Sequence, residues 1–298
     1  MAEVLVTGAT GLLGSSLVPA LAEHHHVVAV TRRPPDEPSG VRWVIHDLRR
    51  PSLPGDLPRS IDVVIHLAQG RAFRDFPEQA LDTYEVNVAS TARLLDWAWR
   101  AGARQFILAS TGGVYPNTGM PHREDEAVDA ASVGNHYAAT KLAAEALAHT
   151  YESRFSVVVL RPFFMYGRVQ ERSMLLPRLA DTIASGGAIS LGGEDGLRFN
   201  PIHVSDAARA VAAALAVPGS TVVNLAGPEA LSLRDAAEIL GARLGREVRF
   251  EREGKSPPDD VIGDTARMAA LLTEPRTALA DVAGELCPVA TEDWSRGA

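Results

Sequence analysis

One segment near the start of the chain constrains the fold more than any other. An apolar run at residues 4–6 stops at Thr7-Gly8, and apolar residues at helical spacing begin at Leu12. Between them, residues 7–14 (TGATGLLG) place a glycine at every third position. A glycine turn between a buried strand and a helix N-terminus is typical of a loop that binds the diphosphate of a dinucleotide.

The glycines of this loop have separate expected roles. Gly8 permits the tight turn, and Gly14 lets the helix pack closely on the sheet. Gly11 lets backbone N–H groups approach a pyrophosphate at the helix N-terminus, where the helix dipole favours anions. We expect the loop to contact the cofactor through Gly8, Thr10, Gly11, Leu12, Leu13 and Gly14.

Strands and helices alternate along the next part of the chain. Continuous apolar runs predict strands at residues 26–30, 41–48, 62–68, 105–109 and 155–160, and helical spacing predicts helices at 83–101 and 137–151. Apolar strands without alternation are typical of a parallel sheet covered on both faces. We therefore expect the α/β class, with a Rossmann-type doubly wound parallel sheet over residues 1–166.

The regular alternation of strands and helices ends after residue 166. Paired glycines punctuate short segments, a helix is expected from Ser205-Asp206 to about Leu215, a strand at 221–225 and a helix at 233–244. We expect residues 167–298 to form a smaller substrate-binding region, with parts of about 199–226 returning to the main sheet.

Charge and cysteine content exclude several classes of partner. The net charge of −8 disfavours non-specific nucleic-acid binding. The single cysteine, Cys287, excludes an intrachain disulfide and a thiolate metal site, and we expect no metal. The chain opens without a signal-like segment and has no long apolar run, so we expect a cytoplasmic protein that does not enter a membrane.

The ends of the second and third strands bear on the choice of cofactor. Asp47 is placed to accept a hydrogen bond from the adenine amino group, or to cap a helix. The second strand ends Thr31-Arg32-Arg33, without the carboxylate that would hold a ribose 2′-hydroxyl. Arginine accommodates a 2′-phosphate, so we expect NADP, with NAD as the alternative if both arginines are merely solvated.

A tyrosine and a lysine open the helix at 137–151. Tyr137 and Lys141 are four residues apart and so share one helix face. Lowering the pKa of a tyrosine from about 10 to about 7 corresponds to roughly 4 kcal/mol, which a nearby cation helps to supply. Thr111, just after the strand at 105–109, can donate to a substrate oxygen while Tyr137 exchanges the proton.

These motifs together resemble a known family. TGATGLLG, Asp47-Leu48, HLA (66–68), Asn87, STGGVY, YAATK and RPFFMYG follow the order of the extended short-chain dehydrogenase/reductases, epimerase/dehydratase branch, over about residues 3–240. The resemblance implies a catalytic triad of Thr111, Tyr137 and Lys141, with Asn87 as a structural support. It implies that Lys141 bonds to the nicotinamide ribose, and that Leu48, Leu67 and Ala68 line the cofactor site.

The resemblance also implies a substrate class and an assembly. Members act mostly on nucleotide-linked sugars, and often form homodimers through a four-helix bundle, here the helices around 83–101 and 137–151. By this resemblance the substrate would contact Ser110, Thr111, Phe164 and Arg198.

Two glycines separate this chain from the dehydratases of the family. In the 4,6-dehydratases the catalytic threonine is followed by Asp-Glu, the acid and base that eliminate water. Gly112 and Gly113 occupy those positions and have no side chain to move a proton. Plain hydride transfer needs only the triad and the cofactor, so we expect an epimerase or a ketoreductase.

Three departures weaken the link to a nucleotide sugar. Phe164 stands where the family often has a substrate-contacting Asn, and Arg198 is one position out of register for the diphosphate. The later phosphate-binding arginine has no clear match; Arg252, Lys255 and Arg267 are the candidates.

Two alternatives therefore stay open: an NADPH-dependent carbonyl reductase of a small metabolite, and a catalytically silent NAD(P)-binding sensor. We also expect residues 124–126 (EDE) to be a solvated loop, and His66 and His203 to be packed core residues.

Overall fold

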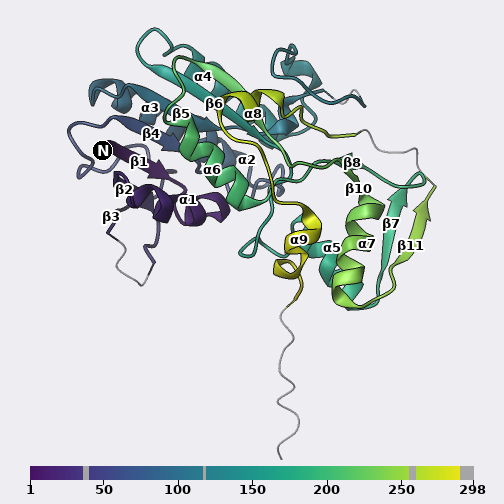
Figure 1. Ribbon diagram of the computed structural model, residues 1–298. Helices are drawn as coiled ribbons and strands as arrows, with labels where there is room; N and C mark the ends of the chain where they lie inside the picture. Colours follow the sequence, from purple (N-terminus) through teal and green to yellow (C-terminus); the bar gives the residue numbers. More distant parts are fainter. Residues whose placement is uncertain (36–39, 117–118, 255–259, 289–298) are drawn as a thin grey trace, which may run out of the picture.

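A computed structural model describes residues 1–35, 40–116, 119–254 and 260–288 of the 298-residue chain. A larger body contains the main sheet, and a smaller lobe carries α5, α7, β7 and β11 (Figure 1). In the described residues no helix is long and apolar enough to cross a membrane.

The main sheet has seven strands, and all of its pairings are parallel. The order reverses between β1 and β4, which is the position where open parallel sheets bind ligands. The predicted doubly wound sheet is therefore confirmed. Its strands, in spatial order, are β3 (Arg42–Ile45), β2 (His26–Thr31), β1 (Glu3–Thr7), β4 (Val63–His66), β5 (Gln105–Ala109), β6 (Ser156–Pro162) and β9 (Thr221–Leu225).

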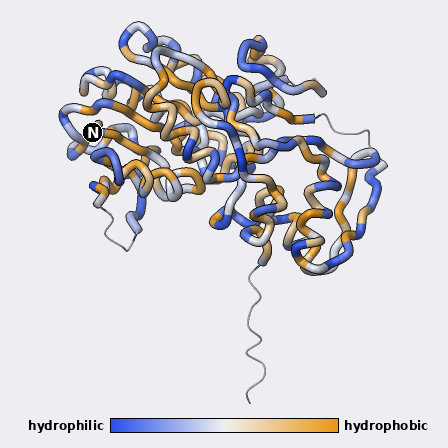
Figure 2. Tube along the Cα trace, in the orientation of Figure 1, coloured by the Kyte–Doolittle hydropathy of each residue, from blue (hydrophilic) through white to orange (hydrophobic). Residues whose placement is uncertain are grey.

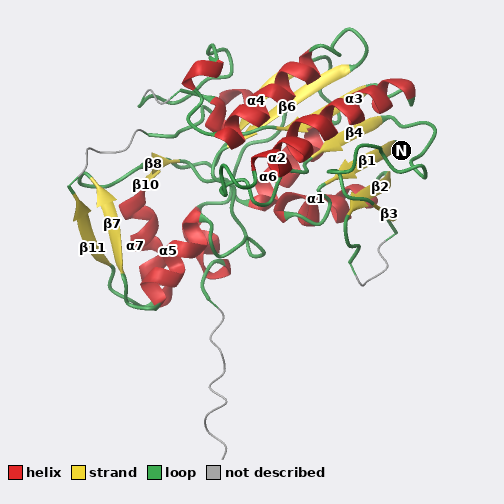
Figure 3. Cartoon of the chain, turned by 180° about the vertical axis from the view of Figure 1, so that it is seen from behind, coloured by secondary structure: helices red, strands yellow, loops and turns green. Residues whose placement is uncertain are grey.

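Helices cover both faces of this sheet, as Figure 3 shows. One hydrophobic cluster joins the sheet to α1 (Leu12–Ala22) and α6 (Val204–Ala214). A second cluster joins it to α3 (Ser90–Arg100) and α4 (His136–His149). Hydrophobic residues accordingly run along the central strands, as Figure 2 shows, because both strand faces are withdrawn from water.

The helix expected at 83–101 is a composite. It consists of α2 (Ala80–Tyr84), a π-helical turn η1 (Glu85–Ala89) and α3. Asn87 lies in the π turn, and its side chain bonds away from the helix, to the loop after β4 and to α4. Such turns within α-helices occur frequently at functional sites.

The smaller lobe contains elements that apolar periodicity did not indicate. β7 (Ala188–Gly192) pairs in parallel with β11 (Arg249–Glu253), and β8 (Arg198–Phe199) pairs antiparallel with β10 (Leu231–Ser232). They pack with α5 (Leu175–Ala184), α7 (Leu233–Leu244) and α9 (Leu279–Val282) around a third hydrophobic cluster. After this lobe's β11, α8 (Ala266–Leu271) returns to the main body, where Met268 is fully buried.

The start of α6 differs from expectation. The N-cap is His203, whose ring accepts from the backbone N–H of Ser205, rather than Ser205-Asp206. Asp206 is buried in the first turn and accepts from the backbone N–H groups of Arg276 and Thr277. His203 and His66 are 6% and 1% exposed, so both are packed histidines, as expected.

Candidate functional site

The glycine loop between β1 and α1 has the conformation that its sequence predicts. Gly8 has φ of +68°, in the left-handed region that favours glycine. Gly11 is the N-cap of α1 and supplies no side-chain cap, so the N–H groups of the first turn stay available for an anion.

Side chains are excluded from this loop by close backbone contacts. A Cβ on Gly14 would lie 2.2 Å from the carbonyl oxygen of Gly8, and a Cβ on Gly8 would lie 2.7 Å from the backbone N of Ala68. The loop therefore fits a pyrophosphate that is bound by main-chain groups. Of the two leucines in the loop, Leu13 is buried and Leu12 is partly exposed.

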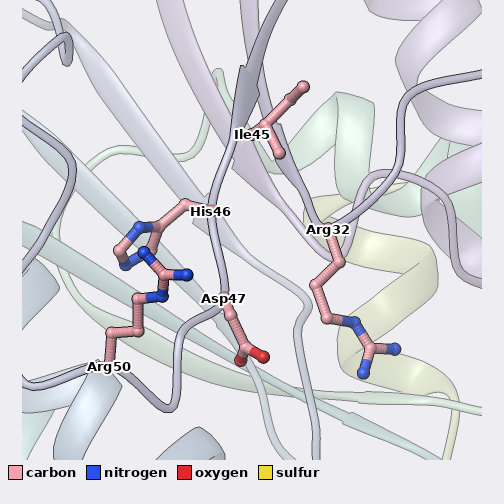
Figure 4. A pocket seen from close by; sticks show the side chains of 5 residues that line it. All are labelled: Arg32, Ile45, His46, Asp47 and Arg50. Carbon is pink, nitrogen blue, oxygen red and sulfur yellow. The ribbon is translucent and has the colours of Figure 1, made fainter.

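A pocket of about 360 Å³ lies at the ends of β2 and β3. Figure 4 shows its lining side chains: Arg32, Ile45, His46, Asp47 and Arg50. Arg32 and Arg33 are exposed, whereas Thr31 is buried and its hydroxyl lies 3.1 Å from that of Thr10.

Asp47 already has a strong partner in this pocket. Arg49 donates to its carboxylate, with Nη2 2.5 Å from Oδ2, and also to Asp82 at 2.9 Å. The hydrogen bond from Arg49 lowers the pKa of Asp47 to about 2. Asp47 is therefore an anion at neutral pH, oriented by Arg49. Of the neighbouring cofactor candidates, Leu48 is buried, while Leu67 and Ala68 are partly exposed just after β4.

Tyr137 and Lys141 lie in the first two turns of α4, whose N-cap Asn135 accepts from the backbone N–H of Ala138. Lys141 Nζ donates to the carbonyl of Ala109 at 2.8 Å, and lies 5.9 Å from the ring centroid of Tyr137. This contact joins the lysine to the end of β5, directly before Ser110 and Thr111.

Burial governs the protonation of both groups. It raises the pKa of Tyr137, and a hydrogen bond with Thr111 acts in the opposite direction. It lowers the pKa of Lys141 to about 8, while the negative charge of Glu145 raises it. Thr111 also accepts from the backbone N–H of Gly113 at 3.1 Å. The structure thus brings the three predicted catalytic residues together.

Two residues of the loop after β4 contact the tyrosine and were not predicted. The Tyr137 hydroxyl donates to Gln69 Oε1 at 2.7 Å. The ring centroids of Phe73 and Tyr137 lie 4.7 Å apart. Gln69 directly follows the HLA stretch at the carboxyl end of β4. Its position just after a strand was the only sequence feature that could have indicated a place near the site.

Asn87 joins this loop to the catalytic helix. It is 1% exposed, its Oδ1 accepts from the backbone N–H of Gly70 at 3.0 Å, and its Nδ2 donates to Thr140 at 2.9 Å. Thr140 in turn donates to the carbonyl of Tyr137. The contacts are consistent with a support rather than a reacting group.

The two glycines after Thr111 differ in their surroundings. A Cβ on Gly112 would lie 2.7 Å from the ring of Phe163. A Cβ on Gly113 would have its nearest neighbour at 3.4 Å, the Thr111 hydroxyl. Phe163 therefore occupies the space that a side chain at 112 would need.

The expectation of a solvated loop at 124–126 is wrong for Glu124. Its side chain is 4% exposed, because it accepts from the backbone N–H of Asn224 at 2.9 Å and pairs with Arg267 at 3.6 Å. Asp125 is exposed and pairs with Arg123. In this arrangement both carboxylates have partners away from Thr111.

The predicted substrate residues are dispersed. Ser110 is 2% exposed and donates to the buried Glu145. Phe164 has φ of +41° and packs on Phe199, with ring centroids 4.9 Å apart. Arg198 lies on β8 and faces Asp260 at 3.7 Å.

The candidates for the later phosphate-binding arginine have separate positions. Arg267 is engaged by Glu124 and by the carbonyl of Val222, and Arg252 is exposed on β11. Lys255 lies outside the described residues. Within the described part of the chain, no group of three or more His, Cys, Asp or Glu is placed to hold a metal ion.

Comparison with known proteins gives related enzymes. A UDP-glucuronate 4-epimerase of Thermodesulfobacterium geofontis is 30% identical over 195 residues, covering 64% of this chain and 60% of that relative, less than two thirds of its length. An uncharacterized UDP-glucose epimerase of Bacillus subtilis, YtcB, is 26% identical over 94% of this chain and 95% of its own. A dTDP-4-dehydro-6-deoxy-D-allose reductase of Streptomyces bikiniensis is 28% identical over 85% of each.

Solved structures agree on the fold. MoeE5 in complex with UDP-glucose and NAD has a TM-score of 0.79 and 29% identity, covering 95% of this chain and 97% of its own. An NDP-hexosamine 5,6-dehydratase, TunA, has the same TM-score at 23% identity, which shows a shared fold alone.

The family model for the NAD dependent epimerase/dehydratase family matches residues 4–226, most of the chain. This span contains the glycine loop, all of the main sheet except the first residue of β1, and the Thr111, Tyr137 and Lys141 cluster. The chain therefore belongs to the NAD dependent epimerase/dehydratase family and is a nicotinamide-dependent enzyme of the extended short-chain dehydrogenase/reductase type.

Proposed function

We propose that the protein transfers a hydride at a hydroxyl or carbonyl carbon of a nucleotide sugar, as an epimerase or a ketoreductase and not as a 4,6-dehydratase. The carrying observation is the cluster at the end of β5, where Thr111 and Lys141 both approach Tyr137. The positions after Thr111 hold only glycine, so the cluster has the groups for hydride transfer without those for elimination.

Each residue of the cluster has a defined task in this proposal. A nicotinamide cofactor held by the glycine loop would supply the hydride chemistry at the substrate carbon, in either direction. The Thr111 hydroxyl holds the substrate oxygen, and Tyr137 gives or takes the proton on that oxygen. Because burial raises the pKa of Tyr137, the charge of Lys141 is needed to favour the phenolate when a hydroxyl substrate is oxidised.

The relatives support this substrate class. The UDP-glucuronate 4-epimerase and YtcB favour an epimerase, while the Streptomyces bikiniensis reductase favours the ketoreductase. We infer that the region after residue 166, apart from segments that rejoin the main sheet, binds the substrate.

A second candidate is an NADPH-dependent reductase of a metabolite without a nucleotide. The contact of Arg198 with Asp260 favours it, because an arginine paired with a carboxylate is less available to a diphosphate. A catalytically silent sensor would retain the cofactor and show no turnover.

Product analysis distinguishes these functions. The purified protein is incubated with UDP-glucose, UDP-glucuronate and a dTDP-4-keto-6-deoxyhexose, with NAD(P)+ or NAD(P)H, and product mass and stereochemistry are measured. Unchanged mass with inverted stereochemistry supports an epimerase, and a gain of two hydrogens at the expense of NADPH supports a ketoreductase. Loss of one water would contradict the proposal.

Denaturing the protein and identifying the released cofactor shows its redox state.

The arginines beyond β2 lead us to propose that NADP(H) binds more tightly than NAD(H). Arg32 lines the pocket beside Asp47, and its charge suits a 2′-phosphate. Arg32→Ala is expected to narrow the difference in Kd between the two cofactors, measured by fluorescence titration. Arg59→Ala, an exposed arginine outside this pocket, is the control and keeps the difference. Equal affinities in the unmutated protein would contradict the proposed preference for NADP(H), and tighter binding of NAD(H) would favour the cofactor that MoeE5 contains.

We further propose a homodimer through the helices around 83–101 and 137–151. A cytoplasmic location, without nucleic-acid or membrane partners, stays a prediction from the sequence.

A further inference from the structure

A buried carboxylate on the catalytic helix α4 has no task in the mechanism above. Glu145 follows Lys141 by one helical turn in α4, and its side chain is 2% exposed. Arg161 of β6 donates to both carboxylate oxygens, from Nε at 3.1 Å and from Nη2 at 2.6 Å. The Ser110 hydroxyl is a third donor. Donors from the ends of two neighbouring strands therefore hold one carboxylate below the catalytic lysine.

This carboxylate connects the two parts of the catalytic cluster. Ser110 directly precedes Thr111, so its bond to Glu145 fixes the end of β5 against α4. On α4, Tyr137, Lys141 and Glu145 follow one another at intervals of four residues, which places them along one helix face. The position of the threonine relative to the tyrosine thus depends on Glu145.

The charges around Lys141 show what else the carboxylate does. The titratable or polar groups around it come from three elements: Tyr137 and Glu145 on α4, His66 on β4, and the Ala109 carbonyl on β5. Arg161 of β6 contacts Glu145 instead. Burial lowers the pKa of His66 to about 3, so that ring is neutral. The burial of Lys141 disfavours its charged form. Glu145 is the anion that opposes this effect.

We propose that Glu145, held by Arg161 and Ser110, is a positioning residue that keeps Lys141 positively charged and keeps Thr111 in register with Tyr137. This inference rests on the proposed function for its purpose, because only proton exchange at Tyr137 needs the lysine charge. Its physical content is independent of the substrate: the pKa of Lys141 depends on the charge of Glu145.

The chain is well suited to a direct measurement, because it has only two lysines, Lys141 and Lys255. Lysine labelled with 13C at Cε gives two NMR signals, and Lys255→Arg assigns them. In Glu145→Gln, which is nearly isosteric, we expect the pKa of Lys141 to fall by roughly one pH unit or more. A folded Glu145→Gln protein in which that pKa does not move would overturn the inference.

Control variants separate charge from structure. Glu152→Gln removes a half-exposed carboxylate just beyond α4 and should leave the pKa of Lys141 in place. Glu145→Asp keeps the negative charge, so the pKa of Lys141 in this variant should stay close to that in the unmutated protein. A purely structural Glu145 would instead lower Tm in Glu145→Gln without moving the Lys141 titration.

A second variant covers the case in which Glu145→Gln fails to fold, since it leaves Arg161 as an uncompensated buried cation. Glu145→Gln with Arg161→Gln removes both charges, and should give a pKa for Lys141 below that of the unmutated protein. A pKa equal to that of the unmutated protein would refute the inference.

Activity gives an independent readout. If the protein turns over a nucleotide sugar, the alkaline limb of its kcat profile should move to lower pH in Glu145→Gln. If it turns over none, the proposed function fails, while the lysine titration still decides the role of Glu145.

Discussion

Tyr137 is the residue on which the proposed chemistry depends, since its hydroxyl is the group that exchanges a proton. Tyr137→Phe removes that hydroxyl and its bond to Gln69 but keeps the ring packed against Phe73. We expect kcat to fall by about 10²- to 10⁴-fold with cofactor affinity unchanged. Turnover assays and cofactor titrations measure the two effects. Tyr151→Phe, a tyrosine that packs on Phe155 just after α4, is the matched control. A Tyr137→Phe enzyme with full activity would assign the proton to another group.

The different surroundings of Gly112 and Gly113 predict different effects of substitution on the free energy of unfolding. Gly112→Ala places a methyl group against the ring of Phe163, at 2.7 Å, and should lower the free energy of unfolding by about 1–3 kcal/mol. Gly113→Ala meets its nearest atom at 3.4 Å and should change it by no more than about 0.5 kcal/mol. Urea denaturation of the two variants checks the difference. Equal losses would show that Phe163 moves aside freely, and that packing does not keep side chains away from position 112.

The composite helix α2–η1–α3 supports the site through one side chain. Asn87→Ala leaves the backbone N–H of Gly70 and the Thr140 hydroxyl without their partner in a buried place. We expect a loss of about 1–3 kcal/mol in the free energy of unfolding and a lower kcat, because the loop bearing Gln69 is no longer tied to α4. Denaturation and turnover are measured together. Thr140→Val removes one of the two Asn87 contacts and the bond from Thr140 to the Tyr137 carbonyl, but it keeps Asn87 paired with Gly70. The kcat of Thr140→Val should therefore fall less than that of Asn87→Ala, and a larger fall would contradict the assignment.

The elements of the main sheet were predictable because buried strands have apolar sequences. β5 (QFILA) lies where a nearly continuous apolar run places it, since a parallel strand covered on both faces has no polar side. β11 (RFERE) is mostly exposed and owes its conformation to its pairing with β7, so its sequence lacks that signal. The π turn in the helix from 83 to 101 likewise depends on contacts of Asn87 with distant segments.

The site divides in the same way. Thr111, Tyr137 and Lys141 stand in local motifs, at a strand end and at one helical turn, so the chain alone indicated them. Gln69 and Glu145 belong to the site through contacts across 68 and 35 residues. The position of Gln69 after β4 indicates the edge of the sheet that it occupies, but no local spacing indicates either contact. The same holds for Glu124, whose partners come from the segments around 224 and 267.

At the scale of the whole molecule, the loop that follows β4 contacts the segment before α5. Arg71 pairs with Glu171 at 3.2 Å, and Arg74 donates to the carbonyl of Ser173 at 3.0 Å. The same loop carries Gln69 and Phe73 against Tyr137. The cover of the tyrosine and the segment leading into α5 of the smaller lobe are therefore mechanically connected, at the switch point of the sheet.

The outer face of the composite helix bears on assembly. Leu81 and Tyr84 on α2 and Trp99 on α3 are 80%, 44% and 45% exposed, although all three are large apolar side chains. α2, α3 and α4 lie together on one side of the molecule (Figure 3). Exposed apolar side chains on neighbouring helices favour an interface, and a two-fold dimer would bury the same patch on both subunits.

We therefore expect sedimentation velocity to show a homodimer at micromolar concentration. Leu81→Arg should weaken it by much more than tenfold in Kd, because burying a leucine contributes roughly 1.5–3 kcal/mol and a two-fold interface loses two copies. Val169→Arg, at an exposed apolar residue outside these helices, is the control and should leave the dimer intact. A monomer at all concentrations would contradict the dimer. Dissociation caused by Val169→Arg but not by Leu81→Arg would place the interface elsewhere.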